Sequence, residues 1–309
     1  MSNEIKDAIQ KVIIGKEEVI DLVLTSLLAG GHVLLEDMPG TGKTMLAKTL
    51  AAAIDASFAR IQFTPDLLPS DVTGLNIFNR KTNEFEFHKG PVFCNILLAD
   101  EINRATPRTQ SSLLECMEEK QVTVDGVTRK LEKPFFVIAT QNPIETSGTF
   151  PLPEAQLDRF MMKLSMGMVT GAQEEEILLR FMNGNPLEEV KSVCTKQQIL
   201  DLREEAKKVY VHKELITYIQ KIAEATRNNK EILAGVSPRA TIALLKASQA
   251  YAKIKGRTYV VPEDIKFLAP FVLAHRLVLQ DSFGDSQSAV TLVKQVLHTV
   301  SVPTEEWSR

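Results

Sequence analysis

The sequence predicts an α/β domain with a parallel sheet, followed by a domain built from helices. Uninterrupted apolar runs such as "NILLA" at 95–99 are typical of strands that a parallel sheet buries on both faces. An apolar strand, a glycine-rich turn and a helical pattern follow one another between residues 32 and 54, which is the order of a βα unit. Beyond about residue 171 the apolar spacing becomes that of long helices.

The individual elements follow from apolar periodicity. Helical patterns occupy the first 29 residues and stop at Gly30 and Gly31. Strands are predicted at 32–36, 58–63, 94–100 and 134–142. Helices are predicted at 44–54, 106–119, 173–182, 214–227 and 238–252. Asp125 and Gly126 predict the two-residue turn of a hairpin within residues 121–131.

Length, composition and charge narrow the class of protein. The 309 residues allow two domains, and we predict an α/β domain over 1–168 and a helical domain over 169–309. A content of 44% hydrophobic and 24% charged residues is ordinary for a soluble globular protein. The net charge of -3 disfavours a protein that coats nucleic acid, because such proteins carry a strong basic surplus.

Cysteine usage and hydropathy bear on the compartment. Cys94, Cys116 and Cys194 show no C-x-x-C pairing, which indicates a reducing compartment without a disulfide framework or a cysteine-rich zinc site. The charged N-terminus "MSNEIKDAIQ" lacks the apolar core of a signal peptide. The most apolar run, at 22–35, is shorter than the roughly 20 residues of a bilayer span. We therefore expect a cytoplasmic protein with no membrane segment.

The stretch "LLEDMPGTGKTMLAK" almost matches the phosphate-binding pattern G-x-x-x-x-G-K-[ST], but Asp37 replaces its first glycine. A phosphate chain needs backbone N–H groups aimed inward at a helix N-terminus, and Gly40 and Gly42 allow that approach. Lys43 is expected to reach the β- and γ-phosphates, and the Thr44 hydroxyl to hold Mg²⁺. We expect the Asp37 carboxylate to face away from the phosphates. The alternative is a glycine turn that opens an ordinary helix.

A carboxylate pair and an amide follow two of the predicted strands. Asp100 and Glu101 end "NILLADE", at the sheet edge where open α/β folds bind ligands. Asp100 is expected to hold Mg²⁺, Glu101 to polarise the attacking water, and Asn142 at the end of "FFVIATQN" to orient that water. Taken alone, the acidic pair could equally cap the next segment, and an asparagine before Pro143 could be a turn residue.

These motifs, in this order, resemble those of AAA+ ATPases. The strings "LLADEINRATPRTQSSLLECMEEKQVTVDG", "FFVIATQNPIE" and "FPLPEAQLDRFMMKL" are similar to the MoxR family, a helix-2-insert group related to magnesium chelatase ATPase subunits. The resemblance runs from about residue 13 to "GVSPRA" at 235–240. It implies a P-loop AAA+ core with a five-stranded parallel sheet and a small all-helical lid domain. It also implies a helix-2 insert at about 66–90 and a hairpin insert at about 120–133, which face the central pore in ring-shaped relatives.

The resemblance adds roles for two arginines. Arg159 in "EAQLDRF" matches the arginine finger that a subunit inserts into its neighbour's ATP site, although alone it would suggest a salt bridge to a nearby carboxylate. Arg239 matches the sensor 2 arginine and follows a predicted N-cap, Ser237, where the helix dipole disfavours a cation without an anionic partner. The expected catalytic residues are Lys43, Asp100, Glu101, Asn142, Arg159 and Arg239, with Thr44 and Asp100 as metal ligands. The expected nucleotide contacts are Ile13, Ile14, Gly15, Pro39, Gly40, Thr41, Gly42, Lys43, Thr44 and Met45.

The leading hypothesis is a MoxR-type, chaperone-like ATPase that uses ATP and Mg²⁺ and works as a ring, expected to be a hexamer. The resemblance further implies a von Willebrand factor A domain partner and a role in metal-cofactor insertion or maturation. A chelatase-type subunit, a nucleic-acid-dependent motor and a nucleotide-sensing scaffold remain alternatives. The acidic net charge disfavours the motor, and the set of Glu101, Asn142 and Arg159 disfavours a scaffold without turnover. The protein client stays open.

Overall fold

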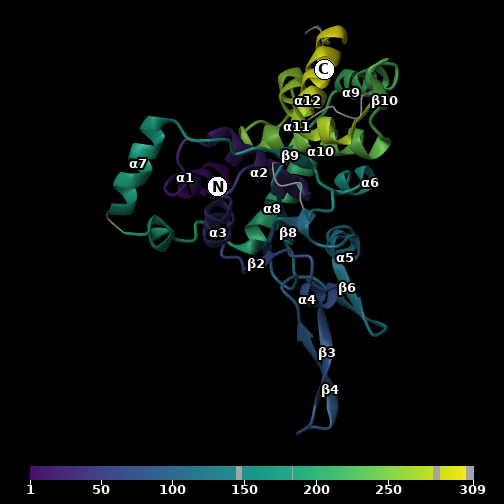
Figure 1. The fold of residues 1–309 in the computed structure, drawn as a ribbon. Coiled ribbons are helices and arrows are strands. Elements are labelled where there is room, and N and C mark those ends of the chain that lie inside the picture. The colour runs from purple at the N-terminus through teal and green to yellow at the C-terminus, as the bar shows by residue number, and fades with distance from the viewer. Residues whose placement is uncertain (144–147, 183, 281–285, 304–309) are drawn as a thin grey trace. The chain divides into compact units, whose positions relative to one another are not determined.

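The computed structural model describes residues 1–143, 148–182, 184–280 and 286–303. The chain divides into two compact units (Figure 1). The first unit comprises residues 1–20, 32–159 and 164–200, and the second comprises residues 21–31, 160–163 and 201–309. Because these units interleave along the chain, the single boundary expected at residue 168 stays a prediction.

The predicted parallel sheet is present and has five strands, in the order β2-β5-β8-β1-β9. The strands are β1 (Val33–Glu36), β2 (Phe58–Gln62), β5 (Ile96–Asp100), β8 (Phe136–Gln141) and β9 (Met162–Leu164). The pairs β2–β5, β5–β8 and β1–β8 are parallel. The apolar side chains of β1, β5 and β8 are fully buried, as expected for inner strands covered on both faces. Edge strand β2 instead leaves Arg60 and Gln62 exposed.

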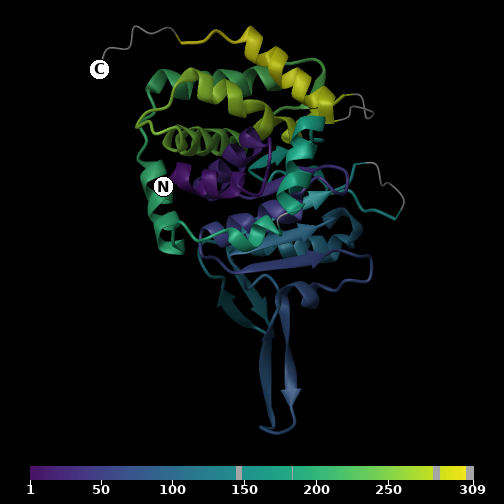
Figure 2. The same ribbon diagram turned by 90° about the vertical axis from the view of Figure 1, so that its left-hand side faces the viewer.

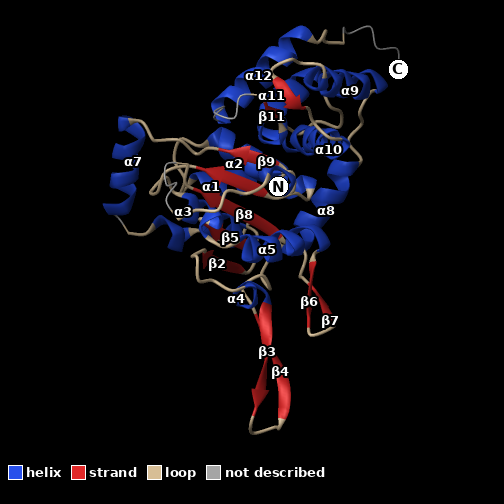
Figure 3. Ribbon diagram, turned by 45° about the vertical axis from the view of Figure 1, so that its right-hand side comes forward, coloured by secondary structure: helices blue, strands red, loops and turns tan. Residues whose placement is uncertain are grey.

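The predicted helices of the first part of the chain are present, and the structure adds others (Figure 3). Up to residue 207 the helices are α1 (Ser2–Gln10), α2 (Glu17–Ala29), α3 (Lys43–Ala53), α4 (Pro69–Thr73), α5 (Pro107–Glu119), α6 (Glu154–Leu157), α7 (Gly171–Met182) and α8 (Lys196–Lys207). Of these, the apolar periodicity did not predict α4, α6 and α8. Helix α3 packs against β2 and β5, and α1 packs against α3. Helix α5 begins at Pro107, whose fixed backbone suits a first helical turn.

Two hairpins extend from the first unit (Figures 1 and 3). The expected turn at Asp125 and Gly126, with φ of 50° and 77°, joins β6 (Gln121–Val124) to β7 (Val127–Lys130). The predicted insert at 66–90 contains α4 and a second hairpin, β3 (Gly74–Asn79) and β4 (Glu84–Lys89). Asn76 donates a hydrogen bond to the Asp125 carboxylate over 2.6 Å, so the two hairpins brace each other.

The second unit is mainly helical, as predicted (Figure 2, green to yellow). Its helices are α9 (Lys213–Arg227), α10 (Pro238–Ile254), α11 (Pro262–Leu273) and α12 (Ser286–Thr299). Two short strands, β10 (Ile232–Ala234) and β11 (Val278–Leu279), pair antiparallel beside them. Helix α10 packs against α9 and α11. Among the described residues, no helix combines the length and the hydropathy needed to cross a bilayer.

The three cysteines are free and buried. Burial raises the pKa of the Cys94 and Cys116 thiols to about 12 and that of Cys194 to about 11. Because the thiolate is the reactive form, these side chains act as small apolar groups of the interior at neutral pH. The chemistry of the chain therefore belongs to other residues.

Candidate functional site

The carboxyl ends of four parallel strands meet at one edge of the sheet. Strand register places Glu36 beside Gln141 and Gln62 beside Asp100. A polar cavity of about 390 Å³ lies at this edge. Its lining residues are Asp37, Pro39, Gly40, Thr41, Gly42, Lys43, Thr44, Met45, Arg60, Gln62, Asp100, Glu101, Thr140, Gln141 and Asn142. The glycine-rich loop, the carboxylate pair and Asn142 thus come together, as the sequence predicts.

The glycine-rich loop opens helix α3. Gly40 and Gly42 have φ of 84° and 90°, a left-handed conformation that a residue with a β-carbon adopts only with strain. Helix α3 begins at Lys43, and its N-cap Gly42 offers no side chain to the first N–H groups. The Lys43 ammonium donates to the backbone carbonyls of Asp37 at 2.9 Å and Met38 at 3.0 Å. An uncapped helix N-terminus beside a lysine is a site that attracts anions.

The Asp37 carboxylate turns to a different segment. Oδ1 accepts hydrogen bonds from Ser165 Oγ at 2.7 Å and from the Gly167 amide at 3.0 Å, and Oδ2 accepts from the Met166 amide at 2.7 Å. The side chain is buried, and all three donors are in the stretch that follows β9. The residue that departs from the phosphate-loop pattern therefore fastens residues 165–167 to the base of the loop.

Replacing Asp37 by asparagine should destabilise the first unit by about 1–3 kcal/mol, the usual cost of leaving a buried polar group unpaired. The asparagine side chain keeps one acceptor oxygen, but its NH₂ group replaces the other oxygen. That NH₂ group would face a hydrogen-bond donor and could not bond to it. Thermal unfolding followed by circular dichroism measures the change. Asp55→Asn, at an exposed left-handed position that asparagine tolerates, is the matched control. Equal midpoints for the two variants would show that these hydrogen bonds contribute little.

Asp100 is bonded on both carboxylate oxygens. Oδ1 accepts the Thr140 hydroxyl at 2.6 Å, and Oδ2 contacts Arg60 Nη2 at 2.6 Å. Thr140 projects from β8, the strand next to β5, so adjacent strands fix the position of the carboxylate. Only 14% of the Asp100 side chain is exposed, and it lines the polar cavity together with Thr44.

Glu101 is held in a less common backbone conformation. Its φ is 56° and its amide donates to Thr140 Oγ1 at 2.8 Å. The Glu101 Oε2 atom accepts from Gln62 Nε2 at 2.7 Å and contacts Arg104 Nε at 3.0 Å. Left-handed conformations of residues other than glycine cluster at functional sites, where neighbouring contacts outweigh the strain. Gln62, Arg104 and Thr140 together aim this carboxylate at the cavity.

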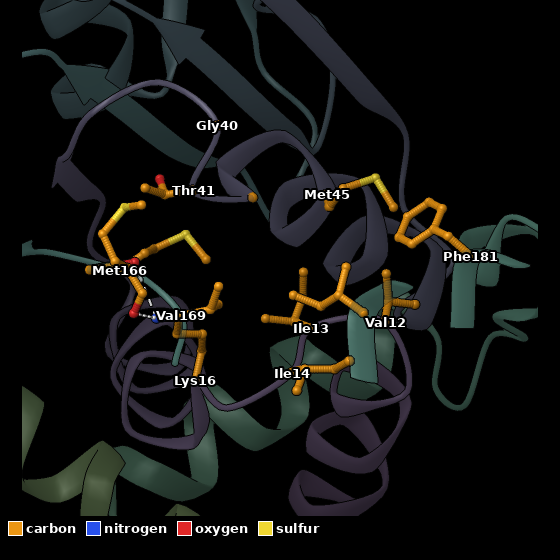
Figure 4. Close-up of a pocket in the computed structure, with 14 residues that line it drawn as sticks. Val12, Ile13, Ile14, Lys16, Gly40, Thr41, Met45, Met166, Val169 and Phe181 are labelled. Atoms are coloured by element: carbon orange, nitrogen blue, oxygen red, sulfur yellow. Dashed lines mark hydrogen bonds between the residues drawn. The ribbon is translucent and has the colours of Figure 1, made fainter. Parts of the chain in front are cut away.

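An apolar cavity of about 200 Å³ adjoins the polar one and shares Gly40, Thr41, Gly42 and Met45 with it (Figure 4). Its other lining residues are Val12, Ile13, Ile14, Lys16, Met166, Gly167, Met168, Val169, Ile177 and Phe181. Lys16 contributes its methylene stem, while its ammonium donates to the carbonyls of Gly167 at 3.1 Å and Met168 at 2.8 Å. The cavity suits a flat apolar group next to an anionic one.

Helix α7 forms one wall of the apolar cavity through Ile177 and Phe181. Arg180 ties the helix to the C-terminal end of α1 by donating to the carbonyls of Gln10 and Lys11. Gly15 is not among the residues that line the cavity, and its role as a nucleotide contact stays a prediction. Gly15 has a φ of 67°, which favours glycine, and the Gln173 side chain of α7 lies against it.

Neither of the two predicted arginines lines these cavities: Arg159 belongs to the first unit and Arg239 to the second. Arg159 follows α6 and contacts Glu118 Oε2 of α5 through Nε at 3.2 Å, with 29% of its side chain exposed. Its carboxylate partner is therefore not one of its sequence neighbours. Arg239 lies in the first turn of α10 in the second unit and is exposed. The N-cap predicted before it is present, since Ser237 Oγ accepts from the Ala240 amide at 3.3 Å.

Several residues that line the two cavities belong to no sequence motif, and the sequence did not predict them as site residues. Arg60 and Gln62 alternate on β2, and Thr140 interrupts the apolar strand β8. Polar residues inside otherwise apolar strands were a usable signal for these three. Phe181 belongs to a helix whose place beside the glycine-rich loop depends on tertiary packing, and nothing local to its sequence indicates it.

Together, the fold and the site define a P-loop nucleotide hydrolase. A glycine-rich loop leads from β1 into a helix, and a carboxylate pair follows a neighbouring parallel strand. Family comparison agrees, because residues 32–162 match the model described as "ATPase family associated with various cellular activities (AAA)". Residues 224–296 match an AAA lid domain.

Individual relatives narrow the class to one family. The chain is 40% identical to the chaperone MoxR1 of Mycobacterium tuberculosis, over 96% of this chain and 80% of that protein. It is 50% identical to the uncharacterised Bacillus subtilis protein YeaC, over 96% of this chain and 93% of that one. A crystal structure from Cytophaga hutchinsonii is similar with a TM-score of 0.90 at 42% identity, covering 98% and 94% of the two chains. The chain belongs to the MoxR family of AAA+ ATPases, whose reaction is ATP hydrolysis.

Proposed function

We propose that the chain binds ATP across its two adjoining cavities and uses the hydrolysis to remodel protein complexes. One observation carries this proposal: Lys43 and the start of α3 line the same polar cavity as Asp100 and Glu101. The apolar cavity next to it, walled by Ile13 and residues nearby, fits the adenine base. The triphosphate then extends from the shared glycines into the polar cavity, where Lys43 and the α3 amides bind it.

The residues present fit both ATP and Mg²⁺. The uncapped N-terminus of α3 presents backbone N–H groups, which bind phosphate oxygens without a change of fold. Thr44 and Asp100 offer a hydroxyl and a carboxylate, the oxygen ligands that Mg²⁺ prefers. Bound Mg²⁺ supplies positive charge that neutralises the phosphates during transfer. Mg²⁺ and these two ligands are therefore part of the proposal.

Within this site Glu101 acts as the base and Asn142 orients the water. As the water oxygen bonds to the γ-phosphorus, the bond to the β–γ bridging oxygen breaks and ADP leaves with its electron pair. The water proton passes to the Glu101 carboxylate. Gln62 and Arg104 both bond to Oε2, so Oε1 is the oxygen that accepts this proton. Phosphate and ADP are the products.

Replacing Lys43 by alanine should weaken ATP binding by about 10–100-fold, the value of a charged hydrogen bond to phosphate. The ammonium now rests on two backbone carbonyls and can exchange them for phosphate oxygens. Isothermal titration with ATP in EDTA measures the loss without turnover. Lys48→Ala, at an exposed position further along the same helix, is the control. Equal affinities in both variants would place the phosphates elsewhere.

We further propose that the site is completed between subunits of a ring, with six subunits as the expected number. Arg159 lines neither cavity of its own chain, which supports a role in a neighbour's site. Its guanidinium would neutralise charge on the γ-phosphate during transfer. Arg239, in the helical domain proposed over 169–309, would contact the nucleotide as a sensor. Mixing variants with defects on opposite sides of a subunit boundary tests the ring.

A protein client is favoured by the β3–β4 hairpin. Its strands expose Ile77, Phe78 and Phe85, and Phe85 is 72% exposed. Exposed aromatic side chains on an extended hairpin suit contact with unfolded or partly unfolded protein segments better than with nucleic acid backbone. The name of the relative MoxR1, a chaperone, agrees with this choice. We propose a remodelling ATPase of the reducing cytoplasm that works with a von Willebrand factor A domain partner. Metal-cofactor insertion or maturation is the role that we propose for this pair.

Two alternatives make different demands on the same site. A chelatase-type subunit would couple turnover to insertion of a metal into a tetrapyrrole. A nucleic-acid motor would show ATP hydrolysis stimulated by single- or double-stranded DNA, which the net charge of -3 disfavours. ATPase measurements with an unfolded protein, with DNA and with neither separate the remodelling ATPase from the motor.

A further inference from the structure

Arg60 forms an ion pair with Asp100, the carboxylate that the proposed function assigns to Mg²⁺. It projects from edge strand β2, lines the polar cavity and contacts Asp100 Oδ2 through Nη2 at 2.6 Å. The Arg60 side chain is 47% exposed, whereas the Asp100 side chain is 14% exposed. The other Asp100 oxygen accepts the Thr140 hydroxyl. The charge of Asp100 is thus neutralised from within the chain.

This contact belongs to a network, unlike most exposed ion pairs. Arg60 Nη2 also donates to Gln62 Oε1 at 3.0 Å, and Gln62 donates through Nε2 to Glu101. Isolated exposed pairs contribute little, but networks with fixed geometry contribute more. Each carboxylate of the pair has its own cation, since Arg104 contacts Glu101 and Arg60 contacts Asp100.

We propose that Arg60 is a positioning residue that holds Asp100 in the metal-free protein and is displaced when Mg²⁺ binds. The inference rests on the proposed function. A guanidinium and a divalent cation on one carboxylate repel each other strongly in a partly desolvated cavity, so they occupy it in turn. Arg60 keeps the Asp100 carboxylate ordered and balances its charge before nucleotide arrives, and the metal has to compete with Arg60. Arg104 contacts Glu101, the other carboxylate of the pair.

The Mg²⁺ requirement of nucleotide binding tests this competition without any turnover. Affinity for the non-hydrolysable analogue AMP-PNP is measured by calorimetry over a series of free Mg²⁺ concentrations, starting in EDTA. The midpoint is the Mg²⁺ concentration at which the affinity gain is half complete. In Arg60→Gln this midpoint should fall by about fivefold, the factor that an ion pair of this exposure contributes. Arg108→Gln removes one positive charge from the exposed first turn of α5, outside both cavities, and should leave the midpoint unchanged.

Arg60→Lys provides the second variant. It keeps the charge but loses the planar fork that meets Asp100 and Gln62 together, so its midpoint should fall between the other two. If Arg60→Gln does not fold, a lowered midpoint in Arg60→Lys still supports the proposal, and an unchanged one overturns it. An unchanged or raised midpoint in a folded Arg60→Gln protein overturns it as well. Failure of the wild-type protein to bind AMP-PNP at all would instead contradict the proposed function.

Discussion

Replacing Glu101 by glutamine should slow ATP hydrolysis by about 10²–10⁴-fold, the usual contribution of a positioned base, while ATP binding stays nearly intact. The carboxamide of glutamine has the shape of the carboxylate but cannot accept the proton of the attacking water. The surrounding contacts favour a folded variant, because the glutamine oxygen can still accept from Gln62 Nε2. The Glu101 amide also keeps its bond to Thr140.

Phosphate release at saturating ATP and Mg²⁺ gives the turnover, and calorimetry in EDTA gives the affinity for ATP. Glu119→Gln is the matched control, since Glu119 is an exposed carboxylate in the last turn of α5. Its turnover should equal that of the wild-type protein. Near-normal turnover in Glu101→Gln would exclude Glu101 as the base and shift the search to another residue of the polar cavity.

The parts of this site that the sequence predicts are local in the chain. Gly40–Thr44 form a turn and a helix start, and their conformation depends on residues within one turn of themselves. Asp100 directly follows an uninterrupted apolar run and Asn142 follows the mainly apolar strand β8, and parallel strands deliver their ends to one edge of the sheet. Local patterns and one rule of topology therefore suffice to place these residues in a single cavity.

The remaining parts depend on contacts between distant segments. Asp37 bonds to Ser165 and Gly167, and Lys16 bonds to Gly167 and Met168, across more than 120 residues of chain. A departure from the phosphate-loop pattern thus has a structural reason that no local pattern contains. Because the buried carboxylate fixes the segment after β9, it also shapes the wall of the apolar cavity. Asp37 therefore supports the apolar cavity through residues 165–167.

Replacing Arg159 by alanine should reduce ATP hydrolysis by about 10³–10⁵-fold, the range for arginines that reach a transferring phosphoryl group. ATP binding should change little, because Arg159 lines neither cavity of its own chain. The contact with Glu118 offers a competing explanation, in which the alanine variant merely loosens α6 against α5. Glu118→Gln separates the two, since it breaks the ion pair and keeps the arginine. Comparable loss of hydrolysis in both variants would favour the structural explanation.

Mixing two inactive proteins decides whether Arg159 acts in a neighbouring subunit. Arg159→Ala supplies an intact Lys43, and Lys43→Ala supplies an intact Arg159. In rings formed at random from equal amounts, about a quarter of the subunit boundaries would join the two intact halves in the productive order. Hydrolysis should therefore reappear on mixing and be absent when the second protein is the Lys43→Ala, Arg159→Ala double variant. Recovery of activity requires a site shared between chains. If the two proteins assemble together and the mixture stays inactive, Arg159 acts within its own chain.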